Sequence, residues 1–319
     1  MRDAFIRRLF DLAKADERIF LITGDLGFGV LDKFAATFPK QYLNAGVAEQ
    51  NMTGLATGMA LDGRIAFTYS IANFPTLRCL EQLRNDAAYH DANVKVVSIG
   101  GGFSYGALGM SHHATEDLAI LRALPQITVT APGCLWEVER VTESLVDWPG
   151  TCYLRLDKSD AGRTNVAGEM FQFGRIRTLR EGSDAAIFAT GGILGVALDA
   201  SAELGKRGYS VRVLSVHSLR PFDTETALDV CAHVKVVTTL EEHGVGGGLG
   251  GLLAETCLEN GVVPSRFFRF GLRGGFCSIV GSQSYLRNRY GLDAGAVVEK
   301  ICALIQAGST GATNDYAVS

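Results

Sequence analysis

The sequence predicts an α/β protein built from two doubly wound domains, each with a mainly parallel sheet. Short β-branched runs alternate with amphipathic stretches along almost the whole chain, an order that favours parallel sheets with helices on both faces. One polar, poorly periodic segment, 159–168, interrupts this alternation. A length of 319 residues also suggests two domains. We therefore expect a first domain, a connector, a second domain and a flexible tail, at 1–165, 166–182, 183–307 and 308–319.

The first domain contains four predicted strands and several predicted helices. Its opening stretch has the spacing of an amphipathic helix, and segment 42–63 is expected to run from a strand end into a helix of small residues. Further amphipathic helices are expected over 76–90 and 115–123. Buried strands are predicted where β-branched runs end in Gly, Pro or polar residues, namely RIFLITGD, KVVSIGGG, QITVTAPG and TCYLRLDKS.

The second domain repeats the alternation. Its predicted strands are DAAIFATGG, YSVRVLSV and VKVVTTLEEH, and its predicted helices lie at 196–207 and 224–232. Ligands of open parallel sheets bind outside the carboxyl ends of the strands. Residues that could contact a ligand follow predicted strands at these ends, namely Asp25, 100–102, Lys158, 191–192 and 241–243.

Bulk composition argues against several classes of protein. A net charge of −4 without a basic stripe gives no reason to expect nucleic-acid binding. No run of about eighteen apolar residues occurs, so no membrane span is expected. The seven cysteines are scattered without a C-x-x-C pair, which argues against a disulfide framework or a zinc site. This cysteine usage predicts a reducing, cytoplasmic location.

Two glycine-rich turns, GGGFSYGALGMSHH and HGVGGGLGGLLAE, follow predicted strands. Either turn could place backbone N–H groups around a phosphate at a helix N-terminus. Neither matches the G-x-x-x-x-G-K-[ST] motif, and neither gives G-x-G-x-x-G with an acidic residue about twenty positions later. Tight turns and close helix packing are therefore the favoured interpretation, with a nucleotide site as the alternative.

The pair His112 and His113 precedes Glu116 and Asp117. A metal would need three or four convergent ligands, whereas adjacent residues point in different directions, so no metal site is expected in this chain. A histidine that exchanges a proton beside a cofactor is the favoured interpretation. A polar cap on the helix that begins near Thr115 is the alternative.

Glu49 is the unusual residue of the segment YLNAGVAEQNMTGLATGMALDG. Glu49 lies at the start of a helix whose closely packing face is formed by residues at helical spacing, namely Ala48, Met52, Leu55, Ala56 and Met59. A buried carboxylate without a partner is costly. Glu49 is therefore either paired with a partner or retained for chemistry, and the residues alone do not decide between these readings.

A series of motifs runs in order through nearly the whole chain. In the first half they are GDLG (24–27), NAGVAEQNMTGLATGMAL (44–61), FTYSIANF (67–74), EQLRNDAAY (81–89), GALGMSHHATED (106–117), APGCLWEVE (131–139) and YLRLDK (153–158). In the second half they are ATGG (189–192), LSVHSLRPFD (214–223), TTLEEHGVGGGLGG (238–251) and YGLDA (290–294). Together they resemble the C-terminal half of the transketolase family, in which G-[IV]-A-E-Q is highly specific to thiamine-diphosphate enzymes.

The resemblance implies a role for Glu49. In the family, the A-E-Q glutamate hydrogen-bonds N1′ of the cofactor's aminopyrimidine, which makes Glu49 both a catalytic and a cofactor-binding residue. A carboxyl proton shared with N1′ favours the form whose 4′-nitrogen takes the proton from thiazolium C2. Phe74 matches an aromatic that stacks on the pyrimidine, whereas Ile71 stands where many relatives have another aromatic. The implied cofactor-binding set is completed by Asp25 and Gln50.

His112 matches a family histidine near the 4′-amino group and is the second implied catalytic residue. Lys158 stands where related enzymes place an arginine that grips substrate phosphate; lysine keeps the charge but loses the bidentate fork. The remaining implied substrate-binding residues are His113, Tyr105, Ser104 and Arg78. The loop over 100–113 lacks the histidine and the acid that hold sugar hydroxyls in ordinary transketolases, with Leu108 near the acid's position. This departure argues against pentose and hexose phosphates as substrates.

The resemblance covers only one part of a transketolase. The family binds the diphosphate and its divalent metal through an N-terminal domain with a G-D-G…N signature, which this sequence lacks. The chain therefore resembles the β-type subunit of a split transketolase, inactive alone and active as α2β2 with a separately encoded subunit that binds the diphosphate and Mg²⁺. The expected reaction is transfer of a two-carbon ketol unit between sugar or sugar-derived carbonyl compounds.

Three alternatives remain open. One is the β subunit of a 2-oxo acid dehydrogenase of the E1 type. Another is a non-catalytic partner that stabilises its α subunit, against which the retention of Glu49 and His112 speaks. A free-standing nucleotide-binding module is the third, and neither glycine-rich turn has the companions that it requires.

Overall fold

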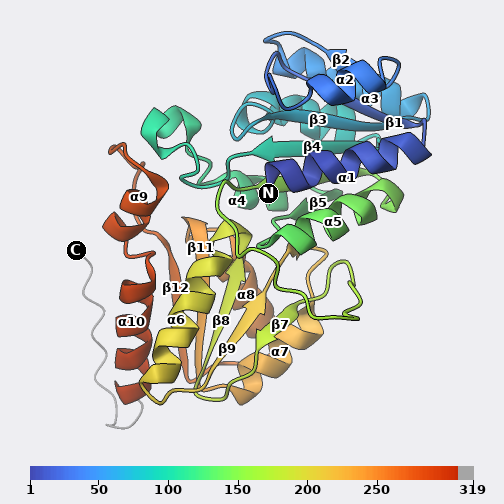
Figure 1. Cartoon of the computed structure of the whole chain (residues 1–319). Helices are drawn as coiled ribbons and strands as arrows, with labels where there is room; N and C mark the ends of the chain where they lie inside the picture. The colour runs from blue at the N-terminus through green and yellow to red at the C-terminus, as the bar shows by residue number, and fades with distance from the viewer. Residues whose placement is uncertain (308–319) are drawn as a thin grey trace.

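The computed structural model describes residues 1–307, so the tail expected over 308–319 lies outside the described residues. Figure 1 shows two α/β units stacked end to end, the first in blue to green and the second in yellow to red. Within the described residues, the first sheet has seven strands in the order β10-β5-β6-β4-β3-β1-β2, and the second has five in the order β12-β11-β8-β9-β7. Both sheets are mainly parallel, which confirms the predicted fold class.

The strands of the first unit pair in parallel with their neighbours. They are β1 (Ile19–Thr23), β2 (Tyr42–Asn44), β3 (Ile65–Ile71), β4 (Val94–Ile99), β5 (Ile127–Thr130) and β6 (Thr151–Leu156). The helices are α1 (Arg2–Ala15), α2 (Asp32–Thr37), α3 (Glu49–Leu61), α4 (Asp117–Ala123) and α5 (Leu135–Asp147). The four strands predicted here are all present, as is the strand-to-helix unit over 42–63.

The amphipathic segment 76–90 differs from the expected α-helix. It forms a short 3₁₀ turn, η1 (Leu77–Cys79), followed by a π-helix, η2 (Gln82–Ala88). The wider π turn places Leu83, Ala87 and Ala88 on the buried side, in the cluster that also contains Met52 of α3. Further along, the 100–113 loop contains two more 3₁₀ turns, η3 (Gly106–Leu108) and η4 (Met110–His112).

The second unit is built in the same way. Its strands are β7 (Arg177–Arg180), β8 (Ala185–Thr190), β9 (Val211–Ser215), β11 (Val236–Gly244) and β12 (Arg266–Leu272), of which β7 is antiparallel to β9. Its helices are α6 (Leu194–Lys206), α7 (Thr224–His233), α8 (Leu249–Glu259), α9 (Gln283–Arg289) and α10 (Ala294–Ala307), with a 3₁₀ turn, η5 (Gly191–Ile193), before α6. Strand β7 lies within the segment expected to be a connector, because its backbone pairs with β9 at the edge of the second sheet.

Strand β10 (Ser218–Arg220) joins the two units. It follows β9 in the second unit but pairs antiparallel with β5 of the first sheet. The backbone N–H of Ala131 also donates to the carbonyl of His217 at 2.9 Å, and the guanidinium of Arg220 donates to the carbonyls of Arg122 and Leu124 at the end of α4. The two sheets are therefore tied by main-chain and side-chain hydrogen bonds.

Apolar cores lie on both faces of each sheet, as doubly wound domains require. In the first unit, α1 and α5 cover one face and α3 with η2 and α4 cover the other. In the second unit, α6 and α10 cover one face and α7 and α8 cover the other. No helix among residues 1–307 is long and apolar enough to cross a membrane.

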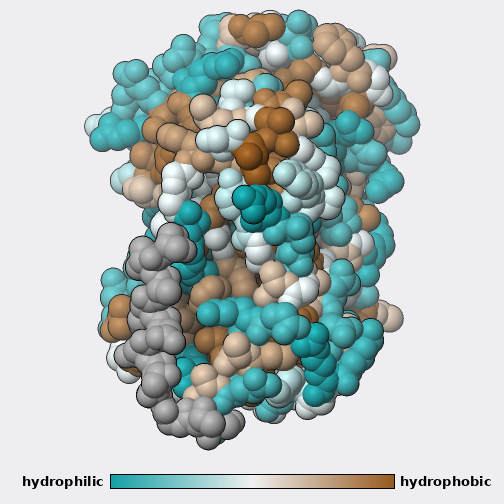
Figure 2. Space-filling model, turned by 90° about the vertical axis from the view of Figure 1, so that its left-hand side faces the viewer, coloured by the Kyte–Doolittle hydropathy of each residue, from teal (hydrophilic) through white to brown (hydrophobic). Residues whose placement is uncertain are grey.

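One face of the molecule carries exposed apolar side chains near the 100–113 loop. Figure 2 shows brown side chains in the upper half of the face that bears α9 and α10 in Figure 1. Leu108, Met110 and Val280 are each more than half exposed. An exposed apolar group of this kind is typical of a surface that contacts a partner or a ligand.

Candidate active site

Glu49 is the first residue of α3 and is almost completely buried, at 3% exposure. The chain reaches it from β2 through a turn in which Gly46 has a φ of +74°, a conformation that favours glycine. Its carboxylate Oε2 accepts a hydrogen bond from Nη1 of Arg78 at 2.7 Å, and the Arg78 side chain is 47% exposed. The carboxylate thus has a partner, and that partner lies at the surface.

Arg78 gathers four other predicted site residues around it. Its guanidinium lies over the ring of Phe74, 4.5 Å from the centroid, and its carbonyl accepts a hydrogen bond from the Gln50 amide at 3.1 Å. The rings of Phe74 and His112 meet edge to face with their centroids 5.3 Å apart. Glu49, Gln50, Phe74, Arg78 and His112 therefore form one group, although they come from three separate segments of the sequence.

A pocket of about 480 Å³ opens beside this group. Predicted substrate residues Ser104, Tyr105 and Lys158 line it. The Lys158 ammonium lies 3.9 Å from the centroid of the Tyr105 ring, and that ring is 6.4 Å from the His112 ring. Burial raises the pKa of Tyr105, so its phenol stays protonated and can donate a hydrogen bond. The pocket thus offers a cation, a phenol and a hydroxyl.

Three predicted residues lie apart from these contacts. His113 is buried at 3% exposure, packs against Phe103 with ring centroids 5.1 Å apart, and contacts the carbonyl of Gly106 at 3.3 Å. It does not line the 480 Å³ pocket. Asp25 adopts a φ of +56° after β1 and exchanges hydrogen bonds with the side chain of Asn44. Ile71 ends β3 and is half-buried.

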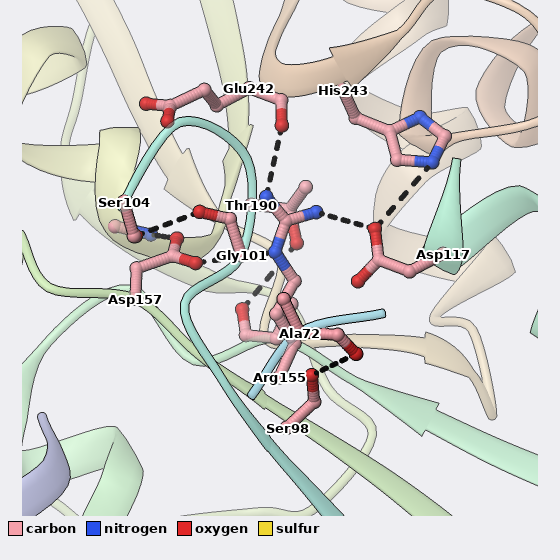
Figure 3. Close-up of polar contacts among 12 residues, drawn as sticks. Ala72, Ser98, Gly101, Ser104, Asp117, Arg155, Asp157, Thr190, Glu242 and His243 are labelled. Atoms are coloured by element: carbon pink, nitrogen blue, oxygen red, sulfur yellow. Dashed lines mark hydrogen bonds and ion pairs between the residues drawn. The ribbon is translucent and has the colours of Figure 1, made fainter. Parts of the chain in front are cut away.

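A buried ionic cluster lies between the two units, centred on Arg155 of β6. Figure 3 shows its guanidinium donating to Asp117, to Asp157 and to the backbone carbonyl of Glu242. Arg155 and its partners are all at most 3% exposed. The sequence places 241–243 at a predicted strand end but assigns no role to Glu242 or Arg155. The available signal for Arg155 is a charged residue inside the apolar run TCYLRL.

The cluster explains the first glycine-rich turn. A Cβ on Gly101 would lie 1.8 Å from Nε of Arg155, and a Cβ on Gly102, whose φ is +57°, would lie 2.5 Å from Oε1 of Glu242. The glycines therefore allow the backbone to pack directly on charged side chains. This contact supports the close-packing interpretation of the turn.

In the second glycine-rich turn, a side chain of the protein already binds the free N–H groups at the helix N-terminus. The carboxylate of Glu241 accepts hydrogen bonds from the N–H groups of Leu249 and Gly250, both at 2.8 Å. These are the donors that a phosphate would use at the start of α8. Among residues 1–307, no group of three or more His, Cys, Asp and Glu side chains is arranged to hold a metal ion.

Two family models match this chain in succession. The pyrimidine binding domain of transketolase matches residues 1–163, and the transketolase C-terminal domain matches residues 174–294. The chain belongs to the transketolase family. Its enzyme class is therefore that of a transketolase-type transferase subunit, and the family implies dependence on thiamine diphosphate.

Relatives of similar length are named as single subunits. The chain is 33% identical over 271 residues to a subunit of the apulose-4-phosphate transketolase of Actinobacillus succinogenes, covering 85% of this chain and 87% of the relative. It is 35% identical over 299 residues to the 6-deoxy-6-sulfo-D-fructose transketolase subunit SqwH of a Clostridium species, covering 93% and 92%. A solved split-gene transketolase, described as an inactive β4 tetramer, superimposes with a TM-score of 0.84 at 31% identity, covering 96% and 97%.

The residues present fit the pyrimidine half of the cofactor. A carboxyl group can share a proton with a ring nitrogen, and an aromatic ring can stack on a heteroaromatic face. Glu49, at 3% exposure, is such a carboxyl group and Phe74 is such a ring, and both contact Arg78. Arg78 lies over the Phe74 ring and bonds Glu49, so one cationic group contacts both.

Proposed function

We propose that this chain is the pyrimidine-binding subunit of a two-chain transketolase that transfers a two-carbon ketol unit between sugar or sugar-derived carbonyl compounds. The observation that carries the proposal is the buried carboxylate of Glu49, placed at a helix start within one group with Phe74 and His112. A carboxylate at a helix N-terminus is stabilised by the helix dipole and can share a proton with a ring nitrogen.

Glu49 holds and orients a proton at N1′ of the aminopyrimidine in this proposal. Phe74 stacks on the pyrimidine face, while Ile71, Asp25 and Gln50 shape the rest of the cofactor site. Bound thiamine diphosphate would supply a carbon nucleophile and an electron sink for carbon–carbon bond cleavage. Arg78 must then share the Phe74 face or leave it, because a stacked ring and a guanidinium compete for the same surface.

His112 is the proposed proton donor and acceptor for the substrate carbonyl. Its ring lies between Phe74 and Tyr105, so it adjoins both the cofactor residues and the pocket. An imidazole carries two ring nitrogens and can both donate and accept a proton.

The pocket residues support substrates with an anionic end. Lys158 offers a positive charge, and Tyr105 and Ser104 offer hydroxyl groups. Arg78 and His113 are proposed to complete the substrate site from its edges. The relatives are named for apulose 4-phosphate and for a sulfonated fructose, both anionic sugars. We propose that this enzyme acts on an anionic sugar derivative of that class.

A separate subunit is proposed to bind the diphosphate and Mg²⁺, in an α2β2 assembly in the cytoplasm. No G-D-G…N signature occurs in this sequence. Exposed apolar side chains adjoin the site residues in the sequence: Val47, Leu77, Leu108 and Met110 are 40% to 75% exposed. An apolar rim around an open site is what a covering subunit would bury.

The test is reconstitution. The purified chain alone should show no turnover, and the chain mixed with its diphosphate-binding partner, thiamine diphosphate and Mg²⁺ should transfer a ketol unit from an α-hydroxycarbonyl donor to an aldehyde. Light scattering of the mixture should give a mass of two copies of each chain. Robust turnover by the single chain would refute the two-chain proposal. Turnover of a 2-oxo acid with loss of CO₂, and none of a ketose, would refute ketol transfer.

A further inference from the structure

The second unit forms one wall of the substrate pocket. Three consecutive residues before and at the start of α9, Gly281, Ser282 and Gln283, line it opposite Tyr105 and Lys158. The backbone N–H of Gly281 donates to the carbonyl of Gly106 in the 100–113 loop at 3.2 Å. The pocket is therefore shared between the two units, and its α9 side was not among the residues that the sequence singled out.

Glu242 of β11 binds both sides of this pocket. Its carboxylate accepts the backbone N–H of Phe103 at 2.5 Å and the side-chain amide of Gln283 at 2.9 Å. It also accepts a hydrogen bond from Nε of Arg287. Nη2 of the same arginine donates to the Ser159 hydroxyl at 2.7 Å. Glu242 is 2% exposed, so these bonds are shielded from water. One carboxylate thus fixes the loop and the first turn of α9 together.

Apolar packing fixes the loop in the same place. Phe103 is fully buried and stacks on Tyr290 with ring centroids 5.5 Å apart. Together with Cys277 and Leu286 it forms a small cluster made mostly of second-unit residues. The segment that carries Ser104 and Tyr105 is therefore positioned by the second unit as well as by its own sheet, where the N–H of Gly100 donates to the carbonyl of Leu156.

The orientation of the Gln283 amide follows from its partner. A carboxylate only accepts hydrogen bonds, so the amide nitrogen faces Glu242, and it also lies 3.5 Å from the Ser104 hydroxyl. None of the described residues donates to the amide oxygen of Gln283. Gln283 and Lys158 both line the pocket, so an amide oxygen without a donor among the described residues can accept a hydrogen bond from a molecule bound there.

We propose that Gln283 is a specificity-determining residue that accepts a hydrogen bond from a hydroxyl of the sugar substrate, and that Glu242 is the positioning residue that holds it. This inference rests on the proposed ketol transfer. It assigns to the C-terminal domain a direct part in substrate recognition: Lys158 selects the anionic end, and Gln283 selects a hydroxyl on the carbon chain near that end.

The experiment compares a hydroxylated sugar phosphate with the matching deoxy sugar phosphate in the assembled enzyme. Gln283→Met keeps the side-chain length but removes the amide. We expect KM for the hydroxylated substrate to rise about tenfold, kcat to change little, and the preference over the deoxy substrate to disappear. Exchange of the cofactor C2 proton should stay at the wild-type rate, because it needs Glu49 and no substrate. Ser284→Ala, an exposed position on the same helix turn, is the matched control and should behave as wild type.

The outcomes separate the inference from the proposed function. If Gln283→Met keeps the wild-type preference for the hydroxylated substrate, Gln283 does not read a hydroxyl and the inference is overturned. If the assembled wild-type enzyme transfers no ketol unit from any sugar, the proposed function fails and takes the inference with it.

Glu242→Gln tests the positioning role separately. In the isolated chain, hydrogen exchange of the backbone amides over 101–108 should become faster while the circular dichroism spectrum is retained. In the assembled enzyme, KM should rise while C2-proton exchange is unchanged. Wild-type protection over 101–108 in this variant would overturn the positioning role of Glu242.

Discussion

Glu49 and Glu242 are two buried carboxylates with different surroundings. They are 3% and 2% exposed. Among residues 1–307, Glu49 accepts a side-chain hydrogen bond from Arg78 alone, on one of its two oxygens. Glu242 accepts bonds from Phe103, Gln283 and Arg287. Buried polar atoms are normally satisfied. A buried carboxylate with one side-chain donor is therefore suited to accept a ligand, whereas one with three donors is suited to hold neighbouring segments together.

The largest expected effect on catalysis comes from Glu49→Gln. The amide keeps the shape but cannot share a proton with the cofactor ring as a carboxyl does, so C2-proton exchange in the assembled enzyme should fall by about 100-fold or more. Exchange is followed by NMR after mixing with D₂O. Circular dichroism and the melting temperature serve as controls for the fold. Exchange at the wild-type rate would show that Glu49 takes no part in the mechanism, and the contrast between Glu49 and Glu242 would then have no functional basis.

Glu242→Leu should cost stability. Removing the carboxylate leaves the Arg287 cation and the Phe103 N–H without their acceptor in a buried place, and losing one partner of such a pair costs about 3–5 kcal/mol. Urea unfolding measures the change. Glu255→Leu is the control, because Glu255 is 55% exposed and pairs with Arg122 at the surface, where an ion pair contributes about 1 kcal/mol or less. Equal losses in the two variants would contradict the structural role of Glu242.

His217 limits the rule drawn from the two carboxylates. Its Nε2 accepts the N–H of Gly174 at 3.3 Å, but its Nδ1 has no partner among the described residues. It lies against Phe171, with ring centroids 4.8 Å apart, and it is not among the residues that line the pocket. A buried polar atom without a hydrogen-bond partner therefore indicates a ligand site only where other polar or aromatic side chains of a site lie beside it.

The pH dependence of stability tests the burial of His217. Burial lowers its pKa from 6.5 to about 4. Because the folded pKa is depressed, its contribution to stability is complete above pH 6.5 and is lost as the pH falls toward 4, by up to about 3 kcal/mol. Urea unfolding at about pH 7 and about pH 4.5 should show a smaller pH-dependent loss for His217→Gln than for the wild type. Equal losses would mean that His217 titrates normally in the folded chain.

The smallest expected effect is that of Arg78→Gln on stability. Because the Arg78 side chain is 47% exposed, solvent screens its attraction to Glu49, and the free energy of unfolding should change by about 1 kcal/mol or less. Thermal and urea unfolding of the isolated chain measure it. A loss as large as that of Glu242→Leu would show that the Glu49 pair supports the fold and is not held open for a ligand.

The fold was largely predictable from the sequence because its signals are local. Strands such as Ile19–Thr23 and Val94–Ile99 are apolar runs with breakers after them, and α3 follows directly from helical spacing. The partners of β7 and β10 were not predictable. Each strand is short, and its place in a sheet depends on backbone pairing with residues far away in sequence.

The grouping of the candidate site residues was predictable only where a sequence motif contains them. Glu49, Phe74 and His112 stand in segments that resemble the family, and the structure gathers them with Arg78. That Arg78 bonds Glu49 could not be read from a spacing of 29 residues. Gln283 was missed because its segment carries no chemical signature, and it reaches the pocket only through the packing of α9 against the loop.

Strand β10 makes the sheet of the first half depend on the second half of the polypeptide. By lying along β5 it covers a border of the first sheet that would otherwise offer unpaired main-chain groups to any passing strand. A first-unit fragment cut within the connector would expose the edge of β5. It should aggregate at concentrations where the intact chain stays monodisperse. The first half therefore includes in its sheet three residues that the second half donates.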